Sequence, residues 1–197
     1  MTRLTVLRSA DYPRMPWKNG GGSTEEITRD AGQGLDGFGW RLSIADIGES
    51  GGFSLFAGYL RIITVLQGAG MTLNIDGKDS EPLLPSDPFA FSGDSQVSCT
   101  LLDGPIRDFN LIYSPKRYRA RLQWLDVLQP QRFFSSANVF VVFSAAEQMA
   151  ANVGEHPPQL LEKHDCLQLD NADGSLLEVV LYAPRASRVC VIELTAV

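Results

Sequence analysis

Short segments in which apolar and polar residues alternate recur along this chain of 197 residues. In residues 40–45 (WRLSIA) every second side chain is apolar, so an extended strand would bury one face and turn Arg41 and Ser43 to the other. A second alternating segment ends at Asp76-Gly77, which suits a tight hairpin turn because both residues tolerate positive φ. Many short strands separated by Gly, Asp and Pro turns are typical of a sandwich or barrel, so the sequence predicts an all-β protein.

Strand-like segments occupy both halves of the chain and indicate a duplicated barrel or jelly roll. Around residues 114–118, Pro115 and four basic residues interrupt the strand pattern, and we therefore predict two domains, residues 1–114 and 115–197. Residues 117–129 are expected to form a bridge of mixed charge. Residues 23–29 admit either a short helix capped by Ser23 or a strand beside a glycine-rich loop. The expected strands are residues 1–7, 40–45, 59–66, 71–75, 89–91, 97–102 and 108–113, then 139–143, 166–170, 176–182 and 189–194.

Composition limits the partners of such a protein. The formal net charge is −6, which argues against nucleic acid, since backbone phosphates demand a basic face. No apolar run approaches the roughly 18 residues that cross a bilayer, and the N-terminal residues do not have the form of a signal peptide. We expect a cytoplasmic protein without membrane contact, whose three widely spaced cysteines are reduced core thiols.

Residues 16–24 (PWKNGGGST) are the most unusual string in the chain. Three consecutive glycines expose backbone N–H groups that could accept an anion, and Lys18 adds a positive charge. The lysine precedes the glycines and no long helix follows, so this is not a nucleotide-binding loop. A flexible turn is the alternative. The candidate ligand contacts here are Trp17, Lys18, Asn19, Gly20 and Gly21.

Arg41 and Arg61 belong to two different predicted strands, and each is flanked by apolar residues. An arginine inside a barrel is too costly to leave unpaired. One interpretation is a pair of internal salt bridges with Asp46, Asp87 or Asp108. For both arginines together with residues 18–19 we favour recognition of a small carboxylate, because planar guanidinium groups hold carboxylates with two parallel hydrogen bonds.

Further candidate contacts are the hydroxyl of Ser43, the apolar side chains of Phe53, Phe56 and Phe109, and the amide of Asn110, which is costly to bury without a partner. The two histidines, His156 and His164, lie in the other half of the chain. We therefore assign no catalytic residue and no metal ligand. Glu25 and Glu26 could supply a general base, but a capping or solvated role is favoured.

Residues 48–68 have the spacing of the metal-binding motif of cupins. That motif runs from a glycine to His-x-His, then to Glu, and ends at a second glycine. Between Gly48 and Gly68 this chain has Ser54, Phe56 and Arg61 at the ligand positions. Because Arg and Phe cannot ligate a transition metal, the resemblance indicates a cupin barrel with a cationic pocket and no metal or other cofactor.

The chain resembles the HutD family, which also takes in the Ves-type proteins. The resemblance covers almost all of the first 113 residues, and in the second half it consists of strand pattern and length. Gly52 and Ala57 stand where the family usually has proline, which implies a difference in loop rigidity near the pocket. The strings that carry the resemblance are residues 15–27 (MPWKNGGGSTEEI), 40–45, 53–58 (FSLFAG) with Arg61 and Gly68, 103–105 (DGP) and 108–111 (DFNL).

The resemblance implies a bicupin, two tandem cupin-like barrels, in a bacterial cytoplasmic protein that is encoded among histidine-utilisation genes. It implies that the protein restrains expression of that pathway by binding an intermediate, urocanate or N-formylglutamate, and it establishes no enzymatic reaction. Three alternatives remain: a metal-independent isomerase or hydrolase with Lys18 or Glu25 as proton carrier, a scaffold that contacts another protein through the second barrel or residues 117–121, and a Ves-type stress role. Pairing of edge strands favours a homodimer.

Overall fold

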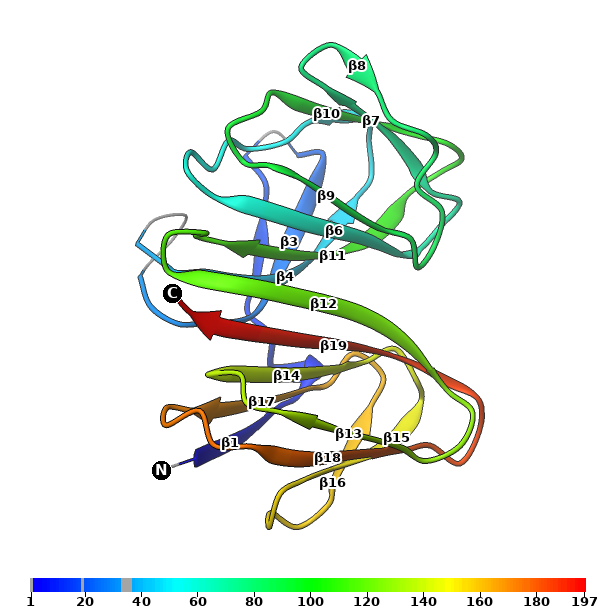
Figure 1. Ribbon diagram of the computed structural model, residues 1–197. Helices are drawn as coiled ribbons and strands as arrows, with labels where there is room; N and C mark the ends of the chain where they lie inside the picture. Colours follow the sequence, from blue (N-terminus) through cyan, green and yellow to red (C-terminus); the bar gives the residue numbers. More distant parts are fainter. Residues whose placement is uncertain (1, 19, 33–36) are drawn as a thin grey trace. The chain divides into compact units, whose positions relative to one another are not determined.

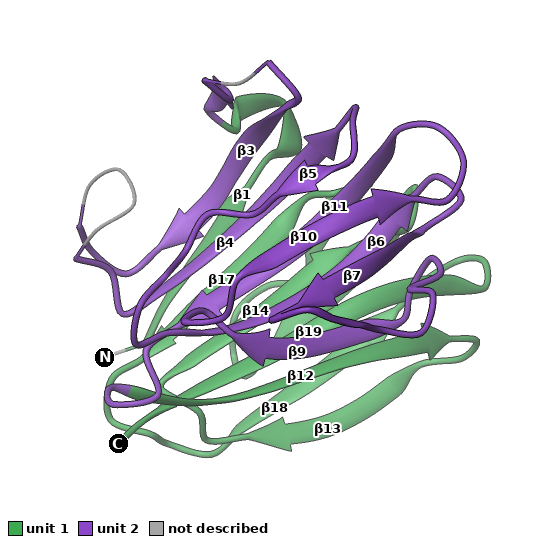
Figure 2. Ribbon diagram, turned by 90° about the horizontal axis from the view of Figure 1, so that it is seen from above, with its two compact units in different colours: residues 1–12, 118–197 green, residues 13–117 purple. Residues whose placement is uncertain are grey.

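The computed structural model describes residues 2–18, 20–32 and 37–197, and within them the chain is built of β-strands (Figure 1). The described residues form nineteen strands and one three-residue 3-10 helix, η1 (Ser9–Asp11), so the all-β prediction is confirmed. The chain divides into two compact units (Figure 2): unit 1 comprises residues 1–12 and 118–197, and unit 2 comprises residues 13–117. Over the described ranges, no helix is long and apolar enough to cross a membrane.

Unit 2 consists of two antiparallel sheets. The predicted turn at Asp76-Gly77 joins β7 (Met71–Ile75) to β8 (Lys78–Asp79) with φ of 51° and 85°, as a tight hairpin requires. The larger sheet has the order β2 (Arg14–Pro16), β3 (Gly22–Arg29), β4 (Trp40–Ile47), β11 (Ile106–Tyr113), β6 (Leu60–Gln67) and β9 (Pro88–Ser92). The smaller sheet has the order β5 (Gly51–Gly52), β10 (Val97–Leu101), β7 (Met71–Ile75) and β8 (Lys78–Asp79).

The apolar core of unit 2 is made by alternate residues of these strands. From the larger sheet it takes Ala45 and Ile47 of β4, Ile63 and Val65 of β6, and Ile106 of β11. From the smaller sheet it takes Met71, Leu73, Val97 and Cys99. Side chains two positions apart in a strand lie on the same face of the sheet. The core face of the larger sheet therefore also carries the other residues at alternate positions of β4, β6 and β11, and several of those residues are charged.

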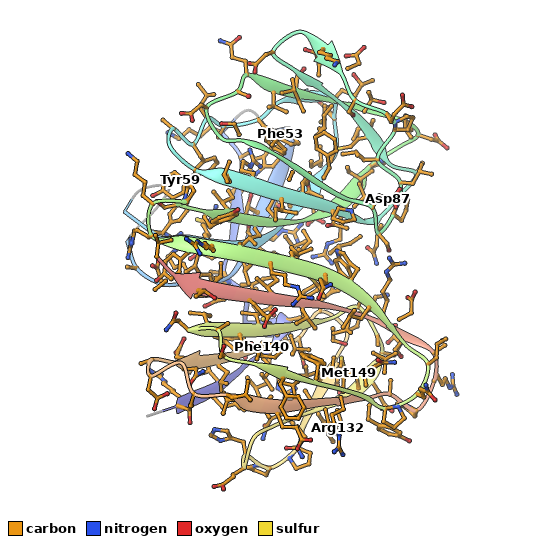
Figure 3. The ribbon with its side chains drawn as sticks, viewed as in Figure 1. Phe53, Tyr59, Asp87, Arg132, Phe140 and Met149 are labelled. Carbon is orange, nitrogen blue, oxygen red and sulfur yellow. The ribbon has the colours of Figure 1, made fainter. Side chains whose placement is uncertain are left out.

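Unit 1 repeats the two-sheet arrangement around its own apolar cluster, which includes Phe140 and Met149, both labelled in Figure 3. Its first sheet has the order β1 (Thr2–Leu7), β17 (Cys166–Asn171), β14 (Val139–Ser144), β19 (Ser187–Ala196) and β12 (Tyr118–Val127). Its second has the order β13 (Gln131–Ser135), β18 (Leu177–Tyr182), β15 (Gln148–Val153) and β16 (Gln159–Glu162). Cys99, Cys166 and Cys190 are buried and free.

Three features correct the sequence predictions or decide between alternatives that they left open. The N-terminal strand pairs with β17 along its whole length, so residues 2–7 lie in the unit formed by the C-terminal half and not with residues 13–114. Residues 23–29 belong to strand β3. The expected mixed-charge bridge is strand β12: its arginines alternate with half-buried residues such as Leu122 and Trp124, so the charged positions simply form the exposed face of a strand.

Candidate functional site

The core face of the larger sheet of unit 2 carries buried polar side chains in consecutive rows. Arg41 of β4 and Arg61 of β6 both pair with Ile112 of β11, one on each side of it. The next row contains Ser43 and Asn110, and the row after that contains Asp108, which lies between Ala45 and Val65. We call the set Glu26, Arg41, Ser43, Phe53, Phe56, Arg61, Phe91, Asp108 and Asn110 the arginine site.

Arg61 is held by an amide and not by a direct ion pair. Only 7% of Arg61 is exposed. Its Nη2 donates to Oδ1 of Asn110 at 2.8 Å, and its Nη1 lies 3.4 Å from the carbonyl oxygen of Ser54. Nδ2 of Asn110 donates in turn to Oδ1 of Asp108 at 2.9 Å. Asn110 therefore links the guanidinium to the carboxylate, while Nε of Arg61 and Oδ2 of Asp108 have no hydrogen-bond partner.

Three phenyl rings surround the Arg61 guanidinium. Its Cζ lies 5.2 Å from the ring centroid of Phe53, 5.4 Å from that of Phe56 and 5.0 Å from that of Phe91. A cation over an aromatic face is stabilised by the ring quadrupole, more strongly where water is excluded. Phe56 also packs with Phe38 and Tyr59, and the Tyr59 hydroxyl donates to the Phe38 carbonyl at 2.6 Å. Phe53 and Tyr59 are labelled in Figure 3.

Burial shifts the protonation of both charged groups in this network. Burial raises the pKa of Asp108 to about 7, against the opposing effects of the Arg61 charge, the Ala45 backbone N–H and Asn110. Burial also lowers the pKa of Arg61 to about 10, an effect that Asp108 opposes and Arg41 reinforces. Arg61 is thus charged at neutral pH, whereas Asp108 is divided between its neutral and ionised forms.

Arg41 has a different partner from those expected. Its Nε donates to Oε2 of Glu26 at 2.7 Å, and Nε of Arg29 donates to Oε1 of the same carboxylate at 2.6 Å. Burial raises the pKa of Glu26, but the hydrogen bonds from Arg29 and Arg41 outweigh burial and hold that pKa below its ordinary value. Glu26 therefore serves two arginines. With Arg61 and Asp108 included, the arginine site holds two guanidinium groups and two carboxylates, one of them only partly ionised.

The glycine-rich loop lies at the other end of β4. The N–H of Gly48 donates to the carbonyl of Gly21 at 2.9 Å, so the loop borders the Ile47 end of the strand. Arg41 and Ile47 are six positions apart, which is about 20 Å in an extended strand. The structure therefore does not bring Lys18, which is exposed, or Gly20 and Gly21 to the two arginines.

Some of the other predicted ligand contacts lie at the arginine site and some do not. Ser43, Phe53, Phe56 and Asn110 belong to the arginine site. Trp17 packs against the core of unit 2, where its Nε1 donates to Oγ1 of Thr24 at 2.8 Å. Phe109 is fully buried, but it lies on the opposite face of the sheet from Asp108 and Asn110 and cannot cover a ligand there. Asn19 lies outside the described residues.

A cavity of about 490 Å³ opens beside the glycine-rich loop. Its two arginines are already paired: Arg14 contacts Glu25 and Asp46, and Arg107 contacts the same two carboxylates. The charges balance two against two, so the cavity has no cationic excess to attract an acid. None of the residues of the arginine site lines it. Its lining is Arg14, Gly20, Gly21, Gly22, Ser23, Asp46, Ile47, Gly48, Gln67, Pro105, Ile106 and Arg107.

Sequence reasoning missed Glu26, Phe91 and the bridging role of Asn110. Glu26 could not be matched to Arg41 while residues 23–29 admitted a helix, and the register of β3 shifts between Glu26 and Thr28. Phe91 alternates with Phe89 in the predicted strand of residues 89–91, but the sequence does not show that this strand pairs with the one that carries Arg61. Across the described ranges, no group of three or more His, Cys, Asp and Glu side chains could hold a metal ion.

The paired two-sheet units, with a guanidinium at the metal-ligand position of the motif, define a cupin-type protein. YhhW from Escherichia coli has the same fold, with a TM-score of 0.74, 10% sequence identity and coverage of 99% of both chains. The YlbA protein of E. coli matches with a TM-score of 0.70 and 11% identity, over 96% of this chain and 90% of YlbA. At this low sequence identity, the structural similarity shows only that the fold is shared.

The chain belongs to the HutD family, whose model matches residues 9–190. An uncharacterized 21.2 kDa protein in the hutC 3' region of Pseudomonas putida is 62% identical over 195 residues, 98% of each chain. HutD from Pseudomonas fluorescens SBW25, in a structure described as the formate condition, has a TM-score of 0.87 and 62% identity over 99% of this chain and 100% of its own. A conserved protein of unknown function from Pseudomonas aeruginosa PAO1 has a TM-score of 0.95 and 56% identity, over 98% and 99%.

Protein Ves of Citrobacter koseri is 37% identical over 149 residues, 71% of this chain and 74% of Ves. The resemblance to HutD and Ves proteins seen in the sequence is therefore confirmed. The chain is a cupin-like protein associated with histidine utilisation.

Proposed function

We propose that this protein binds a small carboxylate intermediate of histidine catabolism, urocanate or N-formylglutamate, at the arginine site, and that the bound form restrains expression of the histidine-utilisation genes. The observation that carries the proposal is the burial of Arg41 and Arg61 on one face of a single sheet, at 4% and 7% exposure. Two such charges inside an apolar barrel are costly, and a structural role would be served at lower cost by apolar residues.

The charge balance of the site favours an anion. Within the arginine site, Arg41 and Arg61 face Glu26 and Asp108, and because burial raises the pKa of Asp108 to about 7, the site carries an excess positive charge when Asp108 is protonated. Attraction between charges is strong where water is excluded. Because Arg61 keeps Nε without a partner, it has a donor left for a ligand oxygen.

The shape of the site favours a ligand with a flat or apolar body. Phe53, Phe56 and Phe91 line the guanidinium and would pack against the conjugated chain of urocanate or the methylene groups of N-formylglutamate. Access would lie through the segment between β5 and β6, since Ser54 and Leu55 are exposed while Phe56 beside them is buried. The HutD structure described as the formate condition suggests formate as a minimal probe of the carboxylate contact.

Isothermal titration of the purified protein with urocanate and with N-formylglutamate tests binding. We expect saturable binding of at least one of them, weakened at least tenfold in Arg61→Lys, because an ammonium cannot reproduce the guanidinium geometry. Arg119→Lys, an exposed arginine of unit 1, is the matched control and should leave the Kd unchanged. Circular dichroism verifies the fold of each variant. No binding of either acid to the folded protein overturns the proposal.

A reporter fused to a histidine-utilisation promoter tests regulation. Deletion of the gene for this protein should raise reporter output during growth on histidine, and the Arg61→Lys allele should raise it as the deletion does. If Arg61→Lys weakens binding in vitro but leaves repression intact, restraint does not depend on the ligand.

A further inference from the structure

Asp108 is the most deeply buried carboxylate of the arginine site. It is 1% exposed, Oδ1 accepts from Asn110 at 2.9 Å, and Oδ2 has no hydrogen-bond partner. An ionised carboxylate in such a place lacks part of the hydrogen bonding that normally offsets the loss of water. One carboxylate oxygen is thus free to carry a proton.

The charged groups around Asp108 come from four strands. Arg61 on β6 attracts its charge, and Asp46 on β4 repels it. Arg41, also on β4, acts on Arg61. The negative charge of Asp108 helps to raise the pKa of Cys99 on β10, which burial raises most. Glu26 on β3 is committed to Arg29 and Arg41. Arg61 is therefore the cation on which the charge of Asp108 depends.

A bound carboxylate would compete with Asp108 for that cation. Two carboxylates that share one buried site cannot both remain ionised at low cost, and the pKa of one of them rises strongly. Nε of Arg61 is buried without a partner and could donate directly to the ligand carboxylate, whereas Asp108 reaches Arg61 only through Asn110. The ligand would therefore keep its charge, and Asp108 would lose its own.

We propose that Asp108 takes up one proton from solvent when a small carboxylate binds to Arg61, so that binding by this protein is coupled to proton uptake. The inference rests on the proposed function, because it requires a carboxylate at the arginine site. The proton resides on Oδ2 of Asp108, which then becomes a hydrogen-bond donor, and its charge offsets that of the ligand carboxylate at Arg61.

The position of Asp108 in the free protein makes this coupling effective near neutral pH. Since burial raises the pKa of Asp108 to about 7, the group is mostly protonated below that pH and mostly ionised above it. Below about pH 7 the ligand meets a protein that already holds the proton, and affinity is independent of pH. Above it each binding event must first add a proton, so the Kd rises by up to about tenfold per pH unit.

Titration of the full chain with N-formylglutamate, and with formate as a smaller probe, tests the coupling, because neither acid changes its ionisation between about pH 6 and pH 9. At each pH the titration is run in two amine buffers that hold that pH and differ in their heats of ionisation, which gives the number of protons bound. We expect uptake close to zero at about pH 6 and approaching one proton per ligand at about pH 8.5, with a Kd that increases over the same interval.

Asp108→Asn imitates the protonated form and should bind at about pH 8.5 with the Kd that the wild type shows at about pH 6, without proton uptake. Asp103→Asn, an exposed carboxylate of the same unit, should keep the wild-type pH dependence. The wild-type measurement alone decides the matter if Asp108→Asn does not fold. Binding with no proton uptake at either pH overturns this inference and leaves the proposed function standing, whereas no binding at any pH overturns both.

Discussion

The cost of a buried charge is met differently at the two arginines of the site. Arg41 has an ionised partner, Glu26, at 2.7 Å. Arg61 has an amide and three aromatic faces, and its counter-ion Asp108 is one hydrogen-bonded step away. A direct buried pair holds both charges firmly, but an indirect one leaves the carboxylate close to its point of neutralisation. The carboxylates of Glu26 and Asp108 should therefore respond differently to pH.

The free energy of unfolding should record the raised pKa of Asp108. Between its unfolded value of about 3.8 and its folded value of about 7 the native state keeps a proton that the unfolded state has lost. The unfolded state binds fewer protons in that window, so the contribution of Asp108 to stability falls as pH rises, at most by about 1.4 kcal/mol per pH unit. Urea denaturation of the wild type and of Asp108→Asn from about pH 4 to pH 8 measures it.

Because other titrating groups are common to both proteins, the difference between their unfolding free energies isolates Asp108. That difference should shift in favour of Asp108→Asn as pH rises and become constant above about pH 7. A difference that does not vary with pH would mean that Asp108 is not a raised-pKa carboxyl.

Removing the charge of Glu26 should lower the free energy of unfolding more than removing the charge of Glu25. Glu26→Gln leaves Arg41, of which 4% is exposed, without its anion, and an unpaired buried charge costs about 3 kcal/mol or more. Glu25→Gln is the matched control, because Glu25 pairs with the more exposed Arg14 and Arg107, where ion pairs contribute about 1 kcal/mol or less. Equal losses in urea denaturation would contradict the assigned role of Glu26.

At the scale of elements, the segment between β5 and β6 shapes the arginine site from outside the sheet. It supplies Phe53 and Phe56, and it is tied down where the N–H of Gly93 donates to the Tyr59 carbonyl at 2.8 Å and the N–H of Phe56 donates to the Gly93 carbonyl at 2.9 Å. A glycine is needed there: a Cβ on Gly93 would meet the Tyr59 carbonyl at 2.9 Å and the Phe56 carbonyl closer still.

Gly93→Ala should consequently displace the segment that carries Phe56. We expect a loss of about 1–3 kcal/mol in unfolding free energy, as for overpacking of a filled core, together with weaker ligand binding because Phe56 moves away from Arg61. Gly51→Ala provides the control, since a Cβ on Gly51 meets nothing within 4 Å and its φ is ordinary. Thermal melts and the titrations above measure both effects. Equal behaviour of the two variants would show that the Gly93 contact does not position the segment.

What the sequence could predict at this scale was alternation, and what it could not predict was register. Alternation within β4 placed Arg41 and Ser43 on a common face, and their pairing with Ile112 and Asn110, two positions apart in β11, bears this out. The meeting of Arg41 with Arg61 depends on β11 lying between β4 and β6, which no local pattern encodes. Lys18 was grouped with the arginines by charge alone, although the strand pairing sets it at the far end of β4. Phe109 was placed beside Asn110 although adjacent strand residues face opposite ways.

At the scale of the whole molecule, unit 1 is closed by residues from both ends of the chain. Strand β1 pairs with β17 over six residues, and Arg8 and the backbone of Ser9 then bond to Asp165. Unit 2 is inserted between the two pieces of unit 1 in the sequence. The division into residues 1–114 and 115–197 followed the sequence order, which could not show that the first strand completes the later barrel. Pairing across such a separation is a long-range contact that only the folded chain forms.

This arrangement predicts that a destabilising substitution in β1 also destabilises the strands of unit 1 that come from the C-terminal half of the chain. Val6 pairs with Leu167 and is half-buried against the core of unit 1, so Val6→Asp should place an unpaired carboxylate against that core and destabilise the unit by about 1–3 kcal/mol. Hydrogen exchange measured by mass spectrometry should show lost protection in β14 and β17, with β4, β6 and β11 protected as in the wild type. Arg3→Gln, an exposed position of the same strand, should change neither. Lost protection confined to unit 2 in Val6→Asp would contradict the assignment of β1 to unit 1.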